Sequence, residues 1–320
     1  MLEYSPIRKW FVDGPDAIKV VDSIFSRDVA ALPLGRLAYG VIVDDEGFMY
    51  EELTVVKYSD ERILLMGGEL DTQAQIEKAL LPGTTLTDRR DEYAVASIQG
   101  PNSRALLQRL TDADVSNEAL PYYGALYEVD VAGAPASIFR VGFTAELGYE
   151  IMVPIAHTAQ LWDAILAQKD LGVRLMGLRA LMVARTEAGM LVNGVEYDRK
   201  TTPFECRLGW TIDFDKGNFQ GRSALLAKKD SVDNRLVSIE IDASAENLDN
   251  APLFVDGAQA GRVTVAVPSP VLNGKTLALA RVNGEHASLG TELRIGEGTG
   301  AHAVVRQTPA YDPQRLKAKS

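Results

Sequence analysis

One stretch of sequence decides the fold, and it runs Ala94-Val95-Ala96-Ser97-Ile98-Gln99-Gly100-Pro101-Asn102. The stretch predicts a strand that runs into a helix, because proline is favoured in the first turn of a helix. Apolar positions follow at helical spacing: Ala105, Leu106, Leu107 and Leu110. About eighty-six residues earlier, residues 9–16 repeat the design around Gly14 and Pro15, and an apolar helical pattern follows them. This weak internal repeat predicts two related α+β units rather than one doubly wound sheet.

The rest of the chain extends this division. Strands are expected at residues 37–43, 53–58 and 63–66, so that each unit lays its helices on one face of a mixed sheet. After about residue 230 the sequence changes to short β-rich pieces between turn residues, which predicts a small barrel or sandwich. We therefore predict an α+β fold with an N-terminal lobe at 1–92, a central lobe at 93–229 and a C-terminal β-barrel lobe at 230–320.

Composition narrows the classes of function. Of the 320 residues, 33 are Lys or Arg and 44 are Asp or Glu, so the net charge of −11 argues against nucleic acid as a partner. The sequence contains no apolar run long enough to span a membrane, and it starts without a signal-peptide pattern, so we expect a cytoplasmic protein that does not bind a membrane. One cysteine, and three histidines without metal-ligand spacing, predict no metal site.

The densest group of candidate site residues lies at 142–151, where a loop with two glycines is followed by Tyr149, Glu150 and a strand. An ionised carboxylate only accepts hydrogen bonds, so Glu150 could hold a flat donor edge, such as that of a pterin, with two parallel bonds. A solvated glutamate at the edge of a strand is the alternative. The spacing by itself leaves both open.

Two further segments carry polar candidates. Residues 184–190 end an apolar helix with Arg185, which could reach an anionic or carbonyl-bearing ligand or could form an ordinary ion pair. Residues 208–212 contain Trp210 and precede a loop and a helix start at 214–225. Cys206 has no histidine near it in sequence, so a buried filler is favoured over a nucleophile.

In this order and at these separations, the segments at 148–151, 185–190, 208–212 and 218–225 resemble the glycine-cleavage aminomethyltransferase, or T-protein-like, family. That family includes tetrahydrofolate-dependent demethylases. The resemblance implies a three-lobed, cloverleaf-like fold with a central channel for tetrahydrofolate, the pterin end deepest. It implies that Glu150 holds the pterin edge, that Tyr149 lines the ring pocket, and that Arg185 lies beside the folate or substrate. Trp210 would lie near the channel, as wall or as ligand contact.

The sequence departs from this family in two places. T-proteins carry an acidic pair after a glycine, with an aspartate beside the reactive end of the folate, and the matching residues here are Glu51 and Glu52. They are the catalytic candidates, although their role in aminomethyl transfer stays open. The chain also starts where family members already have roughly forty to fifty residues behind them, which predicts a more open channel or a protein partner that completes it. A related folate-binding subgroup linked to iron–sulfur cluster assembly carries a cysteine where Asn218 stands here, which argues against that subgroup.

The resemblance implies a tetrahydrofolate-dependent methyl- or aminomethyltransferase that acts on a small methylated substrate, of the demethylase type. The folate amine would attack the methyl or aminomethyl carbon of a small-molecule donor. The alternative is a non-catalytic folate-binding or assembly subunit of a larger complex. A channel that takes another small molecule in place of folate is less favoured, because Tyr149, Glu150 and Arg185 are all present.

Overall fold

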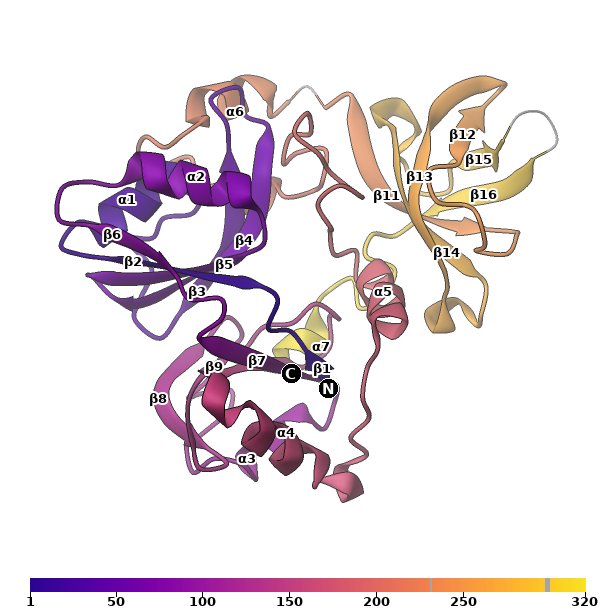
Figure 1. Cartoon of the computed structure of the whole chain (residues 1–320). Coiled ribbons are helices and arrows are strands. Elements are labelled where there is room, and N and C mark those ends of the chain that lie inside the picture. The colour runs from indigo at the N-terminus through magenta and orange to yellow at the C-terminus, as the bar shows by residue number, and fades with distance from the viewer. Residues whose placement is uncertain (231, 297–299) are drawn as a thin grey trace.

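The computed structural model describes residues 1–230, 232–296 and 300–320, and it places three lobes around a common centre (Figure 1). The first lobe has five strands and two helices: β2 (Arg8–Asp13), α1 (Ala17–Ile24), β3 (Leu37–Val43), β4 (Met49–Ser59), β5 (Arg62–Gly67), α2 (Leu70–Ala79) and β6 (Thr85–Asp88). The strand order in its sheet is β3-β4-β5-β2-β6. Helix α1 buries Ala17, Val20, Val21 and Ile24, the positions that share one face at helical spacing.

The second lobe repeats this plan with the order β8-β9-β10-β7-β1. Its elements are β1 (Leu2–Glu3), β7 (Tyr93–Gln99), α3 (Ser103–Gln108), β8 (Ala125–Val131), β9 (Ala134–Phe139), β10 (Gly148–Pro154) and α4 (Thr158–Leu166). In each lobe the strand before the Gly-Pro helix start pairs with the last strand of a three-strand meander. The internal repeat in the sequence is therefore a repeat of topology.

Two details of this plan differ from the sequence prediction. The strand pairs in both five-stranded sheets are antiparallel, where mixed sheets were expected. The reason is that each meander is joined by short turns, which cannot link parallel neighbours. In addition, Leu2 and Glu3 pair with Ser97 and Ala96, so the start of the chain belongs to the second lobe and not to the predicted 1–92 lobe.

The two sheets pack against each other through a shared apolar cluster. Its buried members come from both lobes: Phe11, Leu37, Val56, Leu64, Met66, Val95, Ala125, Phe139 and Met152. The helices cover the outer faces, where each lobe has its own core. Residues on the inner faces beyond this cluster consequently face the space between the lobes.

The connection to the third lobe contains η2 (Lys169–Leu171), α5 (Leu178–Glu187), η3 (Gly209–Thr211) and α6 (Arg222–Lys228). The third lobe is a closed barrel, as predicted, in the order β11-β14-β13-β12-β15-β16. Its strands are β11 (Asn234–Ile241), β12 (Pro252–Val255), β13 (Ala258–Pro268), β14 (Thr276–Asn283), β15 (Glu292–Ile295) and β16 (Ala301–Arg306). The chain then returns to the second lobe, where it ends in α7 (Leu316–Lys319), near the N-terminus (Figure 1).

Candidate functional site

Glu150 lies on β10 and is directed towards the space between the two sheets. Strand alternation places it on the same face as Met152, which belongs to the inter-sheet cluster. The side chain is buried, and among the described residues no donor is hydrogen-bonded to its carboxylate. Burial raises the pKa of Glu150 to about 7. A buried acceptor without a donor is costly, so this carboxyl is suited to a ligand that brings donors.

The side chain of Gln99 closes one end of the space beside Glu150. Its amide donates to Ser97 Oγ (3.1 Å) and to the Val141 carbonyl (3.2 Å), and it accepts from Thr144 Oγ1 (3.0 Å). The two glycines of the loop make room for this amide, because a Cβ at Gly142 or Gly148 would lie 2.0 or 2.1 Å from Gln99 Oε1. Sequence reasoning missed Gln99, although the pair of glycines was the visible signal.

A small cavity adjoins Glu150, with a volume of about 10 Å³. Its lining comes from both ends of the second lobe and from α5: Met1, Leu2, Tyr4, Ser97, Gln99, Phe143, Thr144, Glu150, Met176 and Leu181. Five of these residues are apolar and the other five, Glu150 among them, carry polar groups. The volume is about that of one water molecule.

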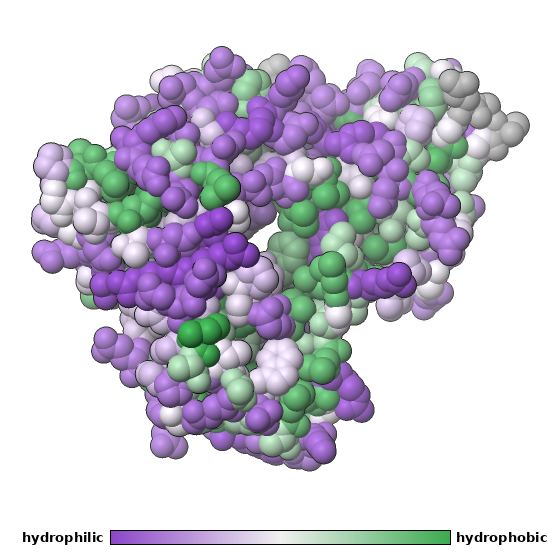
Figure 2. Space-filling view, viewed as in Figure 1, coloured by the Kyte–Doolittle hydropathy of each residue, from purple (hydrophilic) through white to green (hydrophobic). Residues whose placement is uncertain are grey.

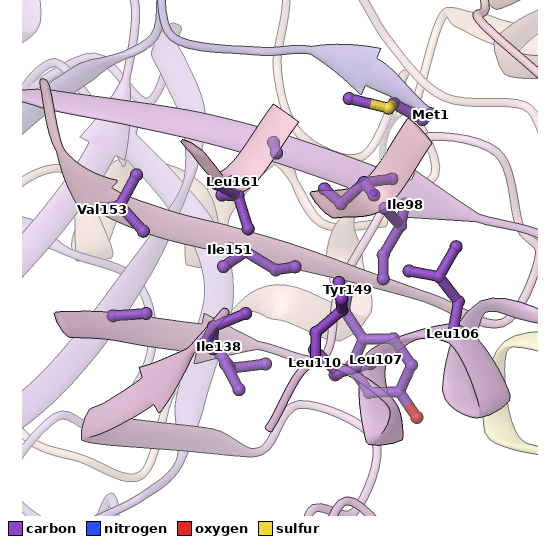
Figure 3. Packing of buried hydrophobic residues seen from close by; sticks show 14 of the residues in the cluster. Met1, Ile98, Leu106, Leu107, Leu110, Ile138, Tyr149, Ile151, Val153 and Leu161 are labelled. Atoms are coloured by element: carbon purple, nitrogen blue, oxygen red, sulfur yellow. The ribbon is translucent and has the colours of Figure 1, made fainter. Parts of the chain in front are cut away.

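Tyr149 lies on the opposite face of β10, away from this cavity. Figure 3 shows its ring among the residues of the second-lobe core, beside Leu107 and Leu110. Its hydroxyl accepts a hydrogen bond from Arg104 Nε at 3.1 Å. This position corrects the expectation that Tyr149 lines the same pocket as Glu150, because neighbouring residues of a strand point to opposite faces.

The acidic pair on β4 is also divided between two faces. The carboxylate of Glu51 accepts from the backbone of Gly68, and from that of Glu69 at 3.2 Å, at the start of α2. Burial raises the pKa of Glu51 to about 7, against the lowering effect of these hydrogen bonds. Glu51 therefore holds the N-terminus of a helix, and this placement corrects its sequence-based assignment as a catalytic residue.

Glu52 faces the other way, towards the centre of the molecule. It lies opposite Val41 in the sheet, close to the phenols of Tyr39 and Tyr197, and its own backbone N–H donates to Tyr197 Oη (3.4 Å). Burial raises the pKa of Glu52 to about 8, with a further rise from Glu51 and Glu196 and a lowering contribution from Tyr39. At neutral pH this carboxyl is thus able to take up or release a proton.

Arg185 is fully buried on α5, one helical turn beyond the cavity residue Leu181. Its Nη1 donates to Glu196 Oε2 (2.6 Å) and to the Met190 carbonyl (3.2 Å). Its Nε and Nη2 are buried without an acceptor among the described residues. Arg185 therefore forms an ion pair, but a buried one that joins α5 to the following loop and not the intrahelical or surface pair that was the alternative. Its Nε and Nη2 remain as donors for a ligand.

The two remaining candidates from the sequence are Trp210 and Cys206. Trp210 is largely exposed and stacks on Tyr39, with ring centroids 6.0 Å apart, so it is an outer wall near Glu52. Cys206 is buried, and burial raises the pKa of its thiol, which fits the filler role. Neither touches the cavity beside Glu150.

Tyr4 is a further residue of the cavity that sequence reasoning missed. It lines the cavity with Glu150, and the charges of Glu150, Glu52 and Glu51, after burial, raise the pKa of its phenol. Its ring therefore lies within electrostatic reach of both central carboxyls. Tyr4, Tyr39 and Tyr197 come from three distant parts of the chain, so only the tertiary fold brings them to this centre.

Within residues 1–230, 232–296 and 300–320, no three His, Cys, Asp or Glu side chains are grouped so that they could hold a metal ion. In the same ranges, no helix has the length and apolar character that crossing a membrane requires.

Comparison with known families finds two matches that together span most of the chain. The GCVT N-terminal domain matches residues 1–216, and the glycine cleavage T-protein C-terminal barrel domain matches residues 234–312.

Curated relatives agree with these matches. An aminomethyltransferase of Listeria monocytogenes is 30% identical over 317 residues, which are 97% of this chain and 86% of that protein. The trimethylamine-oxide aldolase of Ruegeria pomeroyi is 31% identical over 335 residues, and this chain spans 42% of its length. Among solved structures, the glycine cleavage system aminomethyltransferase T of Bartonella henselae superposes with a TM-score of 0.86 at 23% identity. The superposition covers 98% of this chain and 86% of that one, which shows the shared fold.

Proposed function

The chain belongs to the glycine cleavage T-protein family, and on that premise we propose that it is a tetrahydrofolate-dependent one-carbon transferase that acts on a small methylated or aminomethylated substrate. The observation that carries the proposal is the buried carboxyl of Glu150, which adjoins a cavity and accepts no hydrogen bond from the described residues. Glu52, on the sheet of the first lobe, is a second buried carboxyl with a raised pKa.

The pterin edge of the folate fits Glu150. That edge offers an amide N–H and an amine side by side. The two oxygens of the buried carboxyl can accept one hydrogen bond from each, and no described residue donates to them. Arg185 has two further donors one turn from the cavity, which suits a carbonyl oxygen of the ligand. These contacts fix the orientation of the folate, and a fixed orientation accounts for much of the acceleration in a two-substrate reaction.

Glu52 would act at the reacting end. Tetrahydrofolate supplies the nucleophilic amine when it is bound. Because the pKa of Glu52 lies near 8, the carboxyl is mostly protonated at neutral pH and can donate a proton to the reacting group. Positive charge that develops beside it would favour its ionised form, which can neutralise that charge. The phenol of Tyr39 lies beside the carboxyl, and Tyr197 Oη accepts from the backbone N–H of Glu52.

The donor and any protein partner belong to the same proposal. We favour a demethylase-type reaction on a small methylated compound over aminomethyl transfer from a lipoylated carrier, since a glutamate stands here in place of the aspartate of the family's acidic pair. A partner that completes the channel would cover the start of α5, where Leu175 and Leu178 are exposed. Figure 2 shows hydrophobic surface there, beside the hollow between the lobes.

The test uses the two neighbouring glutamates as a matched pair. Each protein is incubated anaerobically with tetrahydrofolate and one of a panel of donors: methylated amines, N-oxides or lipoylated carrier. The folate that has gained a one-carbon group is then measured by chromatography. We expect Glu52→Gln to slow turnover by roughly 100-fold or more while folate still binds. Glu51→Gln should lower stability and leave the rate per folded molecule near wild type.

Folate binding without turnover on any donor would favour the non-catalytic subunit, and turnover with the lipoylated carrier alone would overturn the demethylase preference.

A further inference from the structure

Among the described residues, only one of the guanidinium nitrogens of Arg185 has a hydrogen-bond partner. Nη1 donates to Glu196 Oε2 (2.6 Å) and to the Met190 carbonyl (3.2 Å), whereas Nε and Nη2 are buried without an acceptor. Nε and Nη2 are neighbours on one edge of the planar group, and such an edge matches the oxygens of a carbonyl or carboxyl group. Buried donors are normally satisfied, so the free edge indicates a place for a ligand.

The contacts of Glu196 explain why it takes only one nitrogen of Arg185, where arginine and carboxylate frequently pair through two parallel hydrogen bonds. The side chain of Glu196 is fully buried. Its Oε2 also accepts from the Val192 N–H (2.9 Å), and its Oε1 accepts from Thr264 Oγ1 (2.9 Å). These donors come from the loop after α5 and from β13, and together they fix the carboxylate. From this fixed position it binds Nη1 and leaves the other edge of the guanidinium open.

Thr264 reaches Glu196 because of an irregularity in β13. The pairing of β13 with β14 shifts register between Val263 and Val265, so Thr264 is the extra residue of a bulge. Val263 packs inside the barrel and Val265 packs in the cluster that includes residues of α5, although regular alternation would place both on one face. The bulge therefore turns the strand at Thr264. The Leu279 carbonyl, 3.0 Å from Thr264 Oγ1, competes for the same proton.

A second buried glutamate of this region is also held from the barrel. Glu187 Oε1 accepts from Ser269 Oγ (2.5 Å) and from the Val271 N–H (3.1 Å), just beyond the end of β13. Neither contact involves Arg185. Glu187 and Glu196 thus both join the region of α5 to the barrel, and only Glu196 contacts the guanidinium.

We propose that Glu196, fixed from the barrel by Thr264, is a positioning residue for the folate site: it holds Nη1 of Arg185 so that the Nε–Nη2 edge faces the ligand. Glu196 acts through the guanidinium and does not touch the ligand itself. This inference deepens the proposed function and rests on it, since it takes the folate to be the ligand of Arg185. It also gives the third lobe a part in folate binding, through one hydroxyl of β13.

A double-mutant cycle on folate affinity tests the proposal. Tetrahydrofolate is titrated anaerobically into the wild type, Glu196→Gln, Arg185→Met and the double variant, and each dissociation constant is corrected for the folded fraction. Glu196→Gln should weaken binding by about tenfold or more, because the guanidinium loses its charged partner. In the Arg185→Met background the same change should weaken binding no further, because the group through which it acts is gone.

Glu187→Gln is the matched control. It should lower stability and leave the dissociation constant of folate within about twofold of wild type, because Glu187 does not contact the guanidinium. A loss in Glu187→Gln equal to that in Glu196→Gln would mean that any loosening of α5 weakens binding.

That result would overturn the inference, and so would additive losses in the cycle or wild-type affinity in Arg185→Met. In each of these cases folate binding by the wild type would leave the proposed function standing. Absence of binding by the wild type would overturn both.

Thr264 gives a milder test if Glu196→Gln does not fold. Thr264→Val keeps the ion pair and removes the hydroxyl, so folate affinity should fall by about threefold. Thr264→Ser retains a hydroxyl at this place and should keep the affinity of wild type. Wild-type affinity in folded Thr264→Val, or an equal loss in Thr264→Ser, would contradict the proposal.

Discussion

At the scale of single residues, the site depends on which face of a strand each carboxyl occupies. In two pairs of adjacent residues, the side chains point to opposite faces of the strand. Tyr149 lies in the second-lobe core while Glu150 faces the cavity. Glu51 accepts hydrogen bonds at the start of α2 while Glu52 faces the centre. Alternation along β10 is readable in the sequence. On β4 it is not, because a bulge interrupts the pairing between Ile42 and Val43 just before the glutamates.

If Glu150 binds folate as proposed, its raised pKa makes that binding depend on pH. The empty carboxyl has a pKa of about 7, and a ligand that donates two hydrogen bonds favours the charged form, so binding releases a proton below that pH. We expect a constant dissociation constant above pH 7.5 and a rise of up to about tenfold per pH unit below 7. Calorimetric titration from pH 5.5 to 8.5 measures this, with Glu150→Gln as the control. A wild-type profile no steeper than that of the variant would show that Glu150 does not bind the folate.

At the scale of elements, the loop between β9 and β10 positions the end of the cavity through Gln99. A methyl group at Gly148 would displace the Gln99 amide, which would lose its hydrogen bonds to Ser97, Val141 and Thr144. We expect Gly148→Ala to cost about 1 kcal/mol of unfolding free energy and to weaken folate binding more than tenfold. Denaturant unfolding and calorimetry measure the two effects.

A double-mutant cycle separates this cause from general strain. In a Gln99→Ala background the added methyl meets no amide, so Gly148→Ala should have little further effect on folate binding. Additive losses would mean that the glycine serves the backbone and not Gln99.

The elements themselves were largely predictable from the sequence. The strand expected from residue 94 is β7, and the helix expected after it is α3, which begins at Ser103, just after Pro101 and not around it. Residues 37–43 form β3 with the predicted bounds. The strand at Leu2–Glu3 was not foreseen, because two residues carry no periodicity and their pairing with β7 is set by the tertiary fold. For the same reason Tyr4 was missed as a site residue.

At the scale of the whole molecule, burial raises the pKa of three glutamates well above the ordinary value. The pKa is about 7 for Glu51, about 8 for Glu52 and about 7 for Glu150, all above the 4.5 of an exposed glutamate. Between pH 5 and 7.5 the native state therefore binds more protons than the unfolded state. It follows that stability falls as the pH rises through this window.

We expect the melting temperature to be higher at pH 5.5 than at pH 7.5. Glu150→Gln should flatten part of this slope and should stabilise the protein at pH 7.5, because it removes a buried carboxyl whose ionisation costs on the order of 3 kcal/mol. Scanning calorimetry across the window measures both effects. A melting temperature that rises from pH 5.5 to 7.5 would contradict the electrostatics of the site.

The three-lobed arrangement was predictable as a resemblance, and the closed barrel follows the expected β-rich texture. The packing of the lobes against each other could not be predicted from the sequence. Glu150 and Glu52, ninety-eight positions apart in the sequence, lie on the sheets of two different lobes, and Tyr4 from the segment before β2 lines the cavity beside Glu150. Such long-range placement depends on packing and not on local pattern.

The most direct test of the central claim is anaerobic calorimetric titration of tetrahydrofolate into the wild type, Glu150→Gln and Tyr149→Phe. If Glu150 holds the pterin, the wild type and Tyr149→Phe bind with similar affinity, and Glu150→Gln loses roughly 100-fold or more, as for the loss of a buried charged acceptor. Unchanged binding in Glu150→Gln, or an equal loss in Tyr149→Phe, would contradict the assignment of the pterin site.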